Sequence, residues 1–319
     1  MATKEKLLQL LQTHPGTYFS GEEMALALGV SRTSVWKAVK ALRESGYAID
    51  AVTNRGYCLS PGEDPLDIGQ ISADLSGDFW TLHSEDRVPS TNALLRQLAD
   101  QGAAEGTVIL ANAQTEGRGR MGRQFYSPGD TGIYLSLLLR PRDFSPDQAL
   151  QLTTMAAAAA CTAIEEVTGI RPGIKWVNDL LLDEKKICGI LTEAAFNLET
   201  VSLDYAVAGL GLTLYAPRDG FPPELADIAA PLLPSPVPGT RNRLISAFLN
   251  RFGDLYRSRS FSQAAEVYRS RCLVLGKTVI QNSVPLQVLD VNDRCQLVVR
   301  DPEGQIRTLS YGEVSIVNQ

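Results

Sequence analysis

The stretch GRGRMGRQF, Gly117 to Phe125, decides whether the chain contains a dinucleotide-binding fold or a kinase fold, because both use a glycine-rich loop. Its glycines have the spacing G-x-G-x-x-G, which binds dinucleotides when a strand precedes it and a helix begins inside it. The β-branched and apolar run TVILANAQ, residues 107–114, predicts the strand. The segment RQFYSPGDTG that follows contains a proline and two glycines, so no helix is expected there. The sequence therefore argues against a Rossmann fingerprint, and the lack of V-A-I-K, H-R-D and D-F-G argues against a kinase loop.

Three arginines, Arg118, Arg120 and Arg123, alternate with these glycines. Glycine permits close backbone approach and positive φ. Guanidinium groups donate in a fork to phosphate and carboxylate oxygens. We predict a loop between strands that orders around a phosphate-bearing or acyl-phosphate ligand. The alternative is a basic surface loop without function, and repulsion among three neighbouring cations argues for an anion between them.

Composition places the 319 residues among globular proteins of two or three domains, with 44% hydrophobic and 21% charged residues. No run of eighteen apolar residues predicts a membrane helix, and the start MATKEKLLQLLQ lacks the apolar core of a signal peptide. The five cysteines form no C-x-x-C pair and there are only two histidines, so a zinc site is not expected. We expect a reduced, cytoplasmic protein without membrane contact.

The first 60 residues predict a small domain of three helices and a hairpin. Leucines at helical spacing predict a helix over residues 4–13. The pattern S-x-x-E at Ser20 predicts the capping box of a second helix that ends at Gly29. Strands are expected on both sides of the turn TNRG, residues 53–56. This order is that of a winged helix-turn-helix.

The third predicted helix begins after Ser31 and ends at Gly46. Its expected buried stripe is Val35, Trp36, Val39 and Leu42. The residues expected to face DNA are Arg32, Thr33, Ser34, Lys37 and Lys40, with Arg55 at the hairpin tip. A net charge of +2 on the first 60 residues, against −8 on the remainder, agrees with an anionic partner. A protein-interaction or dimerisation domain is the alternative.

The segment SPGEDPLD, residues 60–67, is predicted to be a linker. After it, Ser90 or Thr91 is expected to cap a helix, and LTTMAAAAACTAIEEVTG, residues 152–169, predicts a closely packed helix. The segment 180–192 predicts a hairpin, and a strand with two glycines is expected over 204–214. Simple alternation on that hairpin would group Lys186 with Cys188 and Ile190, opposite Ile187, Gly189 and Leu191.

The last third of the chain begins with a proline-rich segment, residues 216–239, that is predicted to be a surface crossover. A helix over 241–258 follows, with Leu244, Phe248 and Leu255 inward. From about residue 271 the pattern is all-β, and a small SH3-like barrel fits it.

An ordered set of motifs resembles the biotin–protein ligase family, also called biotin–[acetyl-CoA-carboxylase] ligase. The motifs are Ser90-Thr91-Asn92, Gln114, GRGRMGR (117–123), KWVND (175–179), KKICGIL (185–191) and GLGLT (209–213). With the winged helix-turn-helix of residues 1–60, here called the head, the chain resembles the two-function type that also represses the biotin operon. The resemblance covers nearly the full length.

The resemblance implies an α+β fold in three domains. A winged helix-turn-helix DNA-binding domain (1–60) and a linker (61–66) would precede a central mixed α/β catalytic domain of the class II synthetase/biotin ligase type (67–270). An SH3-like β-barrel (271–319) would follow.

The implied reaction has two halves. Biotin's carboxylate attacks the α-phosphorus of ATP, which gives biotinyl-5′-AMP and pyrophosphate. A lysine of the biotin carboxyl carrier protein of acetyl-CoA carboxylase then attacks the acyl carbon and expels AMP. Mg²⁺ accompanies the ATP, and no protein metal site is expected. In the two-function type the intermediate would favour a homodimer that binds operator DNA and represses transcription.

The site residues are carried over position by position. The catalytic set is Lys186, Arg118, Arg120, Arg123 and Asp179. The biotin-binding set is Ser90, Thr91, Asn92, Gln114, Gly117, Arg118, Lys186 and Gly189. The set for ATP and the adenylate is Arg120, Arg123, Phe125, Lys175, Asn178 and Thr213. Two alternatives stay open, since Asp179 also fits a turn-capping aspartate and Lys175 a hairpin-edge lysine.

The chain departs from the family pattern at four positions. Val177 stands where the family usually has proline, Thr213 where it has asparagine, Met121 where it has arginine and Phe125 where tryptophan is common. The change at Thr213 removes one expected adenine or ribose contact, so these departures bear on nucleotide affinity. The rival functions are a lipoate or octanoate ligase, a regulator with an inactive ligase domain, and a ligase whose head does not bind DNA.

Overall fold

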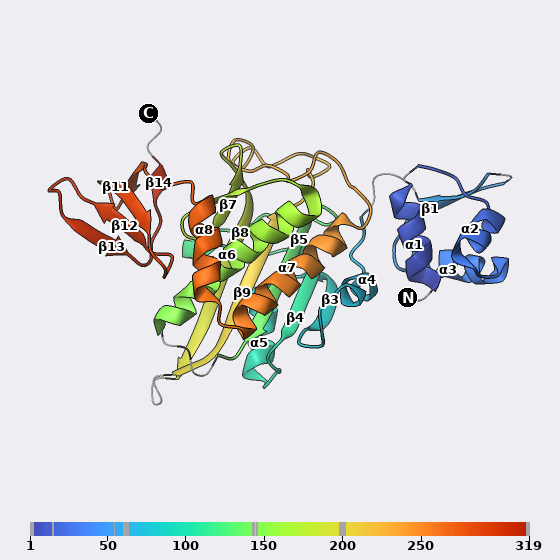
Figure 1. The fold of residues 1–319 in the computed structure, drawn as a ribbon, viewed down its shortest axis with the longest axis horizontal. Helices are drawn as coiled ribbons and strands as arrows, with labels where there is room; N and C mark the ends of the chain where they lie inside the picture. The colour runs from blue at the N-terminus through green and yellow to red at the C-terminus, as the bar shows by residue number, and fades with distance from the viewer. Residues whose placement is uncertain are drawn as a thin grey trace. The chain divides into compact units, whose positions relative to one another are not determined.

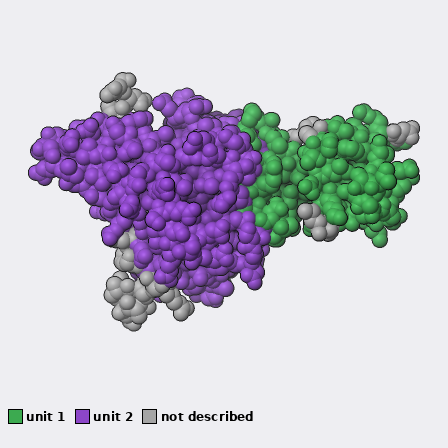
Figure 2. All heavy atoms as spheres, viewed as in Figure 1, with its two compact units in different colours: residues 1–74, 233–246 green, residues 75–232, 247–319 purple. Residues whose placement is uncertain are grey.

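The computed structural model describes residues 3–14, 16–53, 55–59, 64–141, 144, 146–197 and 202–316. The chain divides into two compact units (Figure 2), one of residues 1–74 with 233–246 and one of residues 75–232 with 247–319. Within the described ranges, no helix is both long and apolar enough to cross a membrane.

The first unit contains the predicted helices and hairpin (Figure 1). Its elements are α1 (Thr3–Thr13), α2 (Gly21–Leu28), α3 (Arg32–Glu44), β1 (Ile49–Val52), β2 (Gly56–Leu59) and α4 (Ile68–Ala73). The capping box is confirmed, because Ser20 Oγ accepts from Glu23 N while the Glu23 carboxylate accepts from Ser20 N. Ser31 caps α3 as predicted. Helix α4 was not predicted.

The predicted burial of Trp36 is wrong. The buried residues of α3 are Val35, Ala38, Val39 and Leu42, whereas Trp36 is 55% exposed. At about 100° per residue, Ala38, Val39 and Leu42 lie within about 60° of Val35 round the helix, whereas Trp36 lies about 100° from it, outside the buried stripe. Ala38 takes the place that we assigned to Trp36 in the core.

A buried polar cluster joins residues 64–70 to residues 239–242 and to Tyr47 within this unit. The Asp64 carboxylate accepts from Gly239 N and from Arg241 N, both at 2.6 Å. The buried Asn242 amide donates to Gln70 Oε1 at 2.9 Å, and Tyr47 Oη donates to the same oxygen at 2.7 Å. Burial, followed by the charges of Asp67 and Asp64, raises the pKa of Tyr47.

The predicted domain boundaries stay predictions. The cluster joins residues 64–74 and 233–246 to the head within the first unit. Residues 60–63 of the predicted linker, and Asn54 of the predicted turn, lie outside the described residues.

A seven-stranded sheet forms the centre of the second unit. Its strands are β3 (Thr81–Val88), β4 (Thr107–Gln114), β5 (Gly132–Leu139), β6 (Gly173–Lys175), β7 (Asp179–Leu182), β8 (Lys185–Asn197) and β9 (Ser202–Thr213). Their order is β3-β4-β5-β9-β8-β7-β6, and only the β3–β4 pair is parallel. The mixed sheet confirms the predicted α+β class.

Helices cover both faces of this sheet (Figure 1). On one face, α5 (Thr91–Asp100) packs Leu95 against Ile109, Leu138 and Val207. On the other lie α6 (Pro146–Thr168) and α8 (Phe261–Arg271), which pack against each other, with α7 (Thr240–Arg257) nearby. Helix α8 and strand β3 were not predicted. The first turn of α5 therefore delivers its side chains to the face opposite α6.

The C-terminal residues form a five-stranded antiparallel sheet, as the all-β pattern predicted. Its strands are β10 (Thr278–Gln281), β11 (Val284–Val291), β12 (Leu297–Arg300), β13 (Ile306–Leu309) and β14 (Ser315–Ile316), in the order β13-β12-β11-β10-β14. Closure into an SH3-like barrel is compatible with this order and stays a prediction.

Candidate active site

A cavity of about 420 Å³ opens on the α5 face of the large sheet. Its lining comes from the start of α5, the loop after β4, strands β7 to β9, the crossover segment (216–239) and Glu313 between β13 and β14. The predicted residues that line it are Ser90, Thr91, Asn92, Gln114, Arg118, Arg120, Arg123, Phe125, Lys175, Asn178, Asp179, Lys186, Gly189 and Thr213. Of the predicted catalytic, biotin and ATP residues, Gly117 alone is outside this lining.

The glycine loop folds back on itself as a short hairpin. Phe125 N donates to Gly117 O at 2.8 Å, and Gly119 N donates to Arg123 O at 2.7 Å. A single 3₁₀ turn, η1 (Arg120–Gly122), forms its tip, so the expected absence of a helix is confirmed. Gly117 is buried beneath the loop, where a Cβ would lie 2.3 Å from Phe125 O.

Phe125 explains the glycine pair on β9, which the sequence left as weak evidence. A Cβ on Gly211 would lie 2.5 Å from Phe125 Cε1, so a larger residue would push the ring off the strand. A Cβ on Gly209 would lie 2.1 Å from Asn92 Oδ1. The two glycines therefore let the aromatic ring and the α5 amide approach the floor of the cavity.

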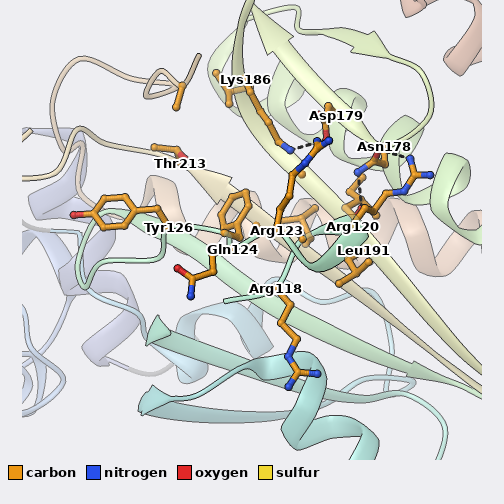
Figure 3. A pocket seen from close by; sticks show the side chains of 18 of the residues that line it. Arg118, Arg120, Arg123, Gln124, Tyr126, Asn178, Asp179, Lys186, Leu191 and Thr213 are labelled. Atoms are coloured by element: carbon orange, nitrogen blue, oxygen red, sulfur yellow. Dashed lines mark hydrogen bonds and ion pairs between the residues drawn. The ribbon is translucent and has the colours of Figure 1, made fainter. Parts of the chain in front are cut away.

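The three loop arginines have different surroundings (Figure 3). Arg120 donates to Asn178 Oδ1 at 3.0 Å and to Gly312 O at 2.9 Å. Arg123 pairs with Glu313 at 2.6 Å. Arg118 is exposed, points away from this group, and has no polar partner within the described part of the chain. Two guanidinium groups thus already contact oxygen atoms, while the third is free to meet an anion.

Lys186 Nζ forms an ion pair with Asp179 Oδ1 at 2.7 Å and lies 6.0 Å from the centre of the Phe125 ring. Its backbone is fixed by the crossover segment, because Lys186 N donates to Ile228 O at 2.8 Å and Lys186 O accepts from Ala230 N at 3.0 Å. The crossover segment therefore fixes the Lys186 backbone, and the Asp179 carboxylate holds the ammonium group over the cavity.

The predicted alternation of side chains on β8 is wrong at this point. Leu181 pairs with Lys186 but Leu180 pairs with Cys188, so Ile187 is an extra residue in a β-bulge. The bulge brings the Lys186 side chain to the face of Gly189, where an added Cβ would lie 3.0 Å from Nζ. Cys188 is fully buried, and burial raises the pKa of its thiol.

A chain of hydrogen bonds fixes the polar end of the cavity. Gln114 Oε1 accepts from Thr91 N at 2.9 Å and from Thr91 Oγ1 at 3.1 Å, while Gln114 Nε2 donates to Ser127 Oγ at 2.9 Å. The hydroxyl of the fully buried Ser136 lies 2.8 Å from Thr91 Oγ1 and 2.6 Å from Asn92 Oδ1. Its single proton serves one of them at a time. One hydrogen of the Gln114 amide remains for a ligand acceptor.

Asn92 uses both amide hydrogens inside the protein. Nδ2 donates to Leu191 O at 3.2 Å and to Glu193 Oε2 at 2.8 Å, and Glu193 in turn pairs with Arg96 at 2.8 Å. Ser90 is 2% exposed and caps α5 through Ala93 N. Asn92 and Ser90 therefore shape the wall, whereas Thr91 and Gln114 keep capacity for a ligand.

The remaining predicted residues lie at the other end. Asn178 Nδ2 donates to Ile190 O at 3.0 Å, which aims its Oδ1 at Arg120. Lys175 is half-buried at the end of β6, without a polar partner in the described ranges. Thr213 ends β9 and binds Leu232 N through its carbonyl. No capping hydrogen bond from the Asp179 carboxylate occurs among the described residues; it pairs with Lys186.

Several lining residues escaped the sequence analysis. They are Gln124, Tyr126, Leu181, Glu184, Phe221, Leu225, Asp227, Ile228, Ala229 and Glu313. Residues 221–229 belong to the segment predicted to be a surface crossover, and Glu313 comes from the end of the chain. Nothing in local periodicity connects either segment with the glycine loop. No cluster of three or more metal-ligating side chains is present within the described ranges.

The residues predicted to bind DNA lie on α3 and the hairpin of the first unit. Arg32, Thr33, Lys37 and Lys40 are exposed, and Ser34 is half-buried with its backbone N on the Ser31 cap. Arg55 is exposed and its guanidinium carbon lies 4.1 Å from the centre of the Tyr18 ring.

Comparison with known proteins gives one consistent result. The family described as "Biotin/lipoate A/B protein ligase family" matches residues 85–212, and an "HTH domain" matches residues 3–58. The bifunctional ligase/repressor BirA of Bacillus spizizenii is 33% identical, over 94% of this chain and 95% of the relative. A biotin–[acetyl-CoA-carboxylase] ligase of Mycobacterium tuberculosis is 31% identical, over 78% of this chain and 95% of the relative.

A solved structure agrees. The biotin protein ligase from Aquifex aeolicus in complex with biotin and ATP is 27% identical, with a TM-score of 0.61 over 75% of this chain and 99% of that one. The chain therefore belongs to the biotin–protein ligase family and carries a helix-turn-helix domain ahead of its ligase domain.

Proposed function

We propose that this chain activates biotin with ATP to biotinyl-5′-AMP and transfers biotin to a lysine of biotin carboxyl carrier protein, and that it also represses transcription. The observation that carries the ligase half is the cavity that gathers the Lys186–Asp179 pair, the arginine–glycine loop and the Thr91–Gln114 pair. The identity with ligase/repressor relatives over 94% of the chain supports both halves.

In the first half-reaction, a carboxylate oxygen of biotin forms a bond to the α-phosphorus and pyrophosphate leaves. Two anions must meet, so a cation between them lowers the barrier. Lys186 takes this position, because its ammonium stands above the cavity floor beside Phe125. Arg120 and Arg123 exchange Gly312 O and Glu313 for phosphate oxygens. Mg²⁺ enters with ATP as part of the substrate and offsets triphosphate charge.

The second half-reaction joins the acceptor lysine to the acyl carbon and releases AMP. Asp179 orients the incoming amine or accepts its proton, since its carboxylate lies at the cavity wall beside Lys186. Arg118 closes over the adenylate, because it alone of the three arginines has no polar partner to give up within the described ranges. Closure also keeps water from the mixed anhydride.

The ligase half is tested by incubating the chain with ATP, Mg²⁺ and either biotin or lipoate. We expect pyrophosphate and the acyl-adenylate with biotin, and little of either with lipoate, followed by labelling of purified carrier protein. Adenylate formation with lipoate alone would favour the rival acid, and no adenylate with either would refute the ligase.

The repressor half rests on the helix-turn-helix match and on the basic exposed face of α3. We propose that biotinyl-AMP favours a homodimer, whose two heads bind the two halves of an operator. Sedimentation and gel-shift titrations with biotin, with biotinyl-AMP and with neither test this. Equal DNA affinity in all three, or unchanged affinity in Arg32→Ala, would contradict it. A cytoplasmic location likewise stays a prediction.

A further inference from the structure

Trp36 is the one apolar side chain among the exposed residues of α3. The others on that helix are Arg32, Thr33, Lys37, Lys40, Arg43 and Glu44. Trp36 is 55% exposed and is absent from the side chains that pack against the core of the head. A tryptophan left in water forgoes the stabilisation that burial of so large a ring would give.

The position of Trp36 on α3 indicates what kind of group it can contact. Arg32 and Lys40 lie one helical turn before and after it, so the three side chains form a line along the surface. Lys37 follows it directly. Trp36 also stands in the N-terminal half of α3, the part of a recognition helix that contacts base edges. A large apolar surface is therefore framed by cations that suit phosphate oxygens.

We propose that Trp36 contacts the 5-methyl group of a thymine in the major groove. This inference rests on the proposed DNA binding and adds a base preference to it. The thymine methyl is the apolar group that the major-groove edges of the bases present. Lys37, Lys40 and Arg32 position the helix on the backbone, while the indole excludes water from the methyl.

The size of the effect follows from the area buried. Burial of one methyl group is worth about 0.8 kcal/mol, which corresponds to about 4-fold in affinity. Two heads on a two-fold operator would give roughly 15-fold. Loss of Trp36 should leave the fold of the head intact, because Trp36 is not among the residues that form or pack against its core.

The test uses the full chain with biotin, ATP and Mg²⁺, and a duplex selected from random sequence by the unaltered protein. Each thymine is replaced in turn by deoxyuridine, which removes the methyl alone. We expect one thymine per half-site at which the unaltered protein loses about 4-fold. Trp36→Ala should bind the two duplexes equally, and Trp36→Phe should keep part of the preference.

Leu26→Ala is the matched control, because Leu26 is an apolar residue of the same head, 86% exposed, and lies on α2. It should keep the full thymine preference. The proposal is overturned if the unaltered protein binds every uracil duplex like its thymine parent, or if Trp36→Ala retains the preference. A change in sedimentation of Trp36→Ala without DNA would assign the residue to contact between copies. Failure to select any duplex would overturn the DNA binding itself.

Discussion

Replacement of Lys186 by alanine is expected to slow catalysis strongly while the protein still folds. The Lys186–Asp179 pair is partly exposed, with 37% and 25% of the two side chains accessible. The Asp179 Oδ1 atom is itself buried, so removal of its partner costs about 1–3 kcal/mol. That loss is small against the roughly 5–15 kcal/mol by which folded domains are stable. Lys186→Ala should therefore fold.

Catalysis should respond much more strongly. A preorganised donor at the developing charge is worth roughly 10²–10³ in rate, or about 2.7–4 kcal/mol. We expect adenylate formation to fall by that factor at saturating biotin and ATP. Release of pyrophosphate in a single turnover measures it, and a denaturation curve checks folding. Lys185→Ala is the matched control, because Lys185 is also half-buried and its ammonium donates to Ala226 O at 3.1 Å, outside the cavity.

The partner residue extends the test to the second half-reaction. If Asp179 serves only to hold Lys186, the double variant Asp179→Ala with Lys186→Ala should be no slower than Lys186→Ala in either half. If Asp179 handles the acceptor amine, transfer from preformed biotinyl-AMP should slow further. A Lys186→Ala protein that forms adenylate at the unaltered rate, with unchanged stability, would refute the role of this lysine.

The remaining predictions concern the loop, the polar wall and the thiols. Arg118→Gly should still form biotinyl-AMP but release it to label lysines of bystander proteins, because loop closure traps the intermediate. Arg171→Gly is the control, since Arg171 is an exposed arginine that pairs with Glu165. Full retention of the adenylate by Arg118→Gly would contradict the trapping role. Glu193→Ala should raise KM for biotin roughly 10-fold with kcat unchanged, because the buried Asn92 amide loses an acceptor worth about 1–3 kcal/mol. Glu193→Gln should restore KM. An unaltered KM in Glu193→Ala would show that the Asn92–Glu193 hydrogen bond does not position the biotin-binding wall. Burial raises the pKa of Cys161 to about 12 and that of Cys295 to about 11. Between the ordinary thiol pKa near 9 and the folded-state values of 11–12, the thiols ionise in the unfolded chain but not in the folded one. The stability contribution of these thiols is therefore fully present below pH 9 and is lost as pH rises toward 11–12. Unfolding titrations should show falling stability above pH 9, less steeply in Cys161→Ala, and an equal slope in both proteins would refute the assignment.

Local chemistry in the sequence was enough for much of the fold. The S-x-x-E pattern at Ser20 predicted the capping box, because its partners are three residues apart and need no tertiary contact. Proline and glycine after the loop excluded a helix there for the same reason, and the glycine hairpin confirms it. The motif set also identified the family, since residue types in order carry that information without geometry.

The placement of side chains from distant segments was decided by the tertiary structure. Lys186 and Gly189 share a face because the pairing of β8 with β7 leaves Ile187 as a bulge, and register between strands is not written in the alternation of one strand. Glu313 reaches Arg123 across 190 residues, and Asn92 uses its amide hydrogens on β8. Trp36 stayed exposed because the packing partners of α3 fixed which stripe of the helix is buried. The sequence alone determined most of the elements, with α4, α8 and β3 as exceptions, and the chemical groups, whereas long-range packing determined which of those groups meet.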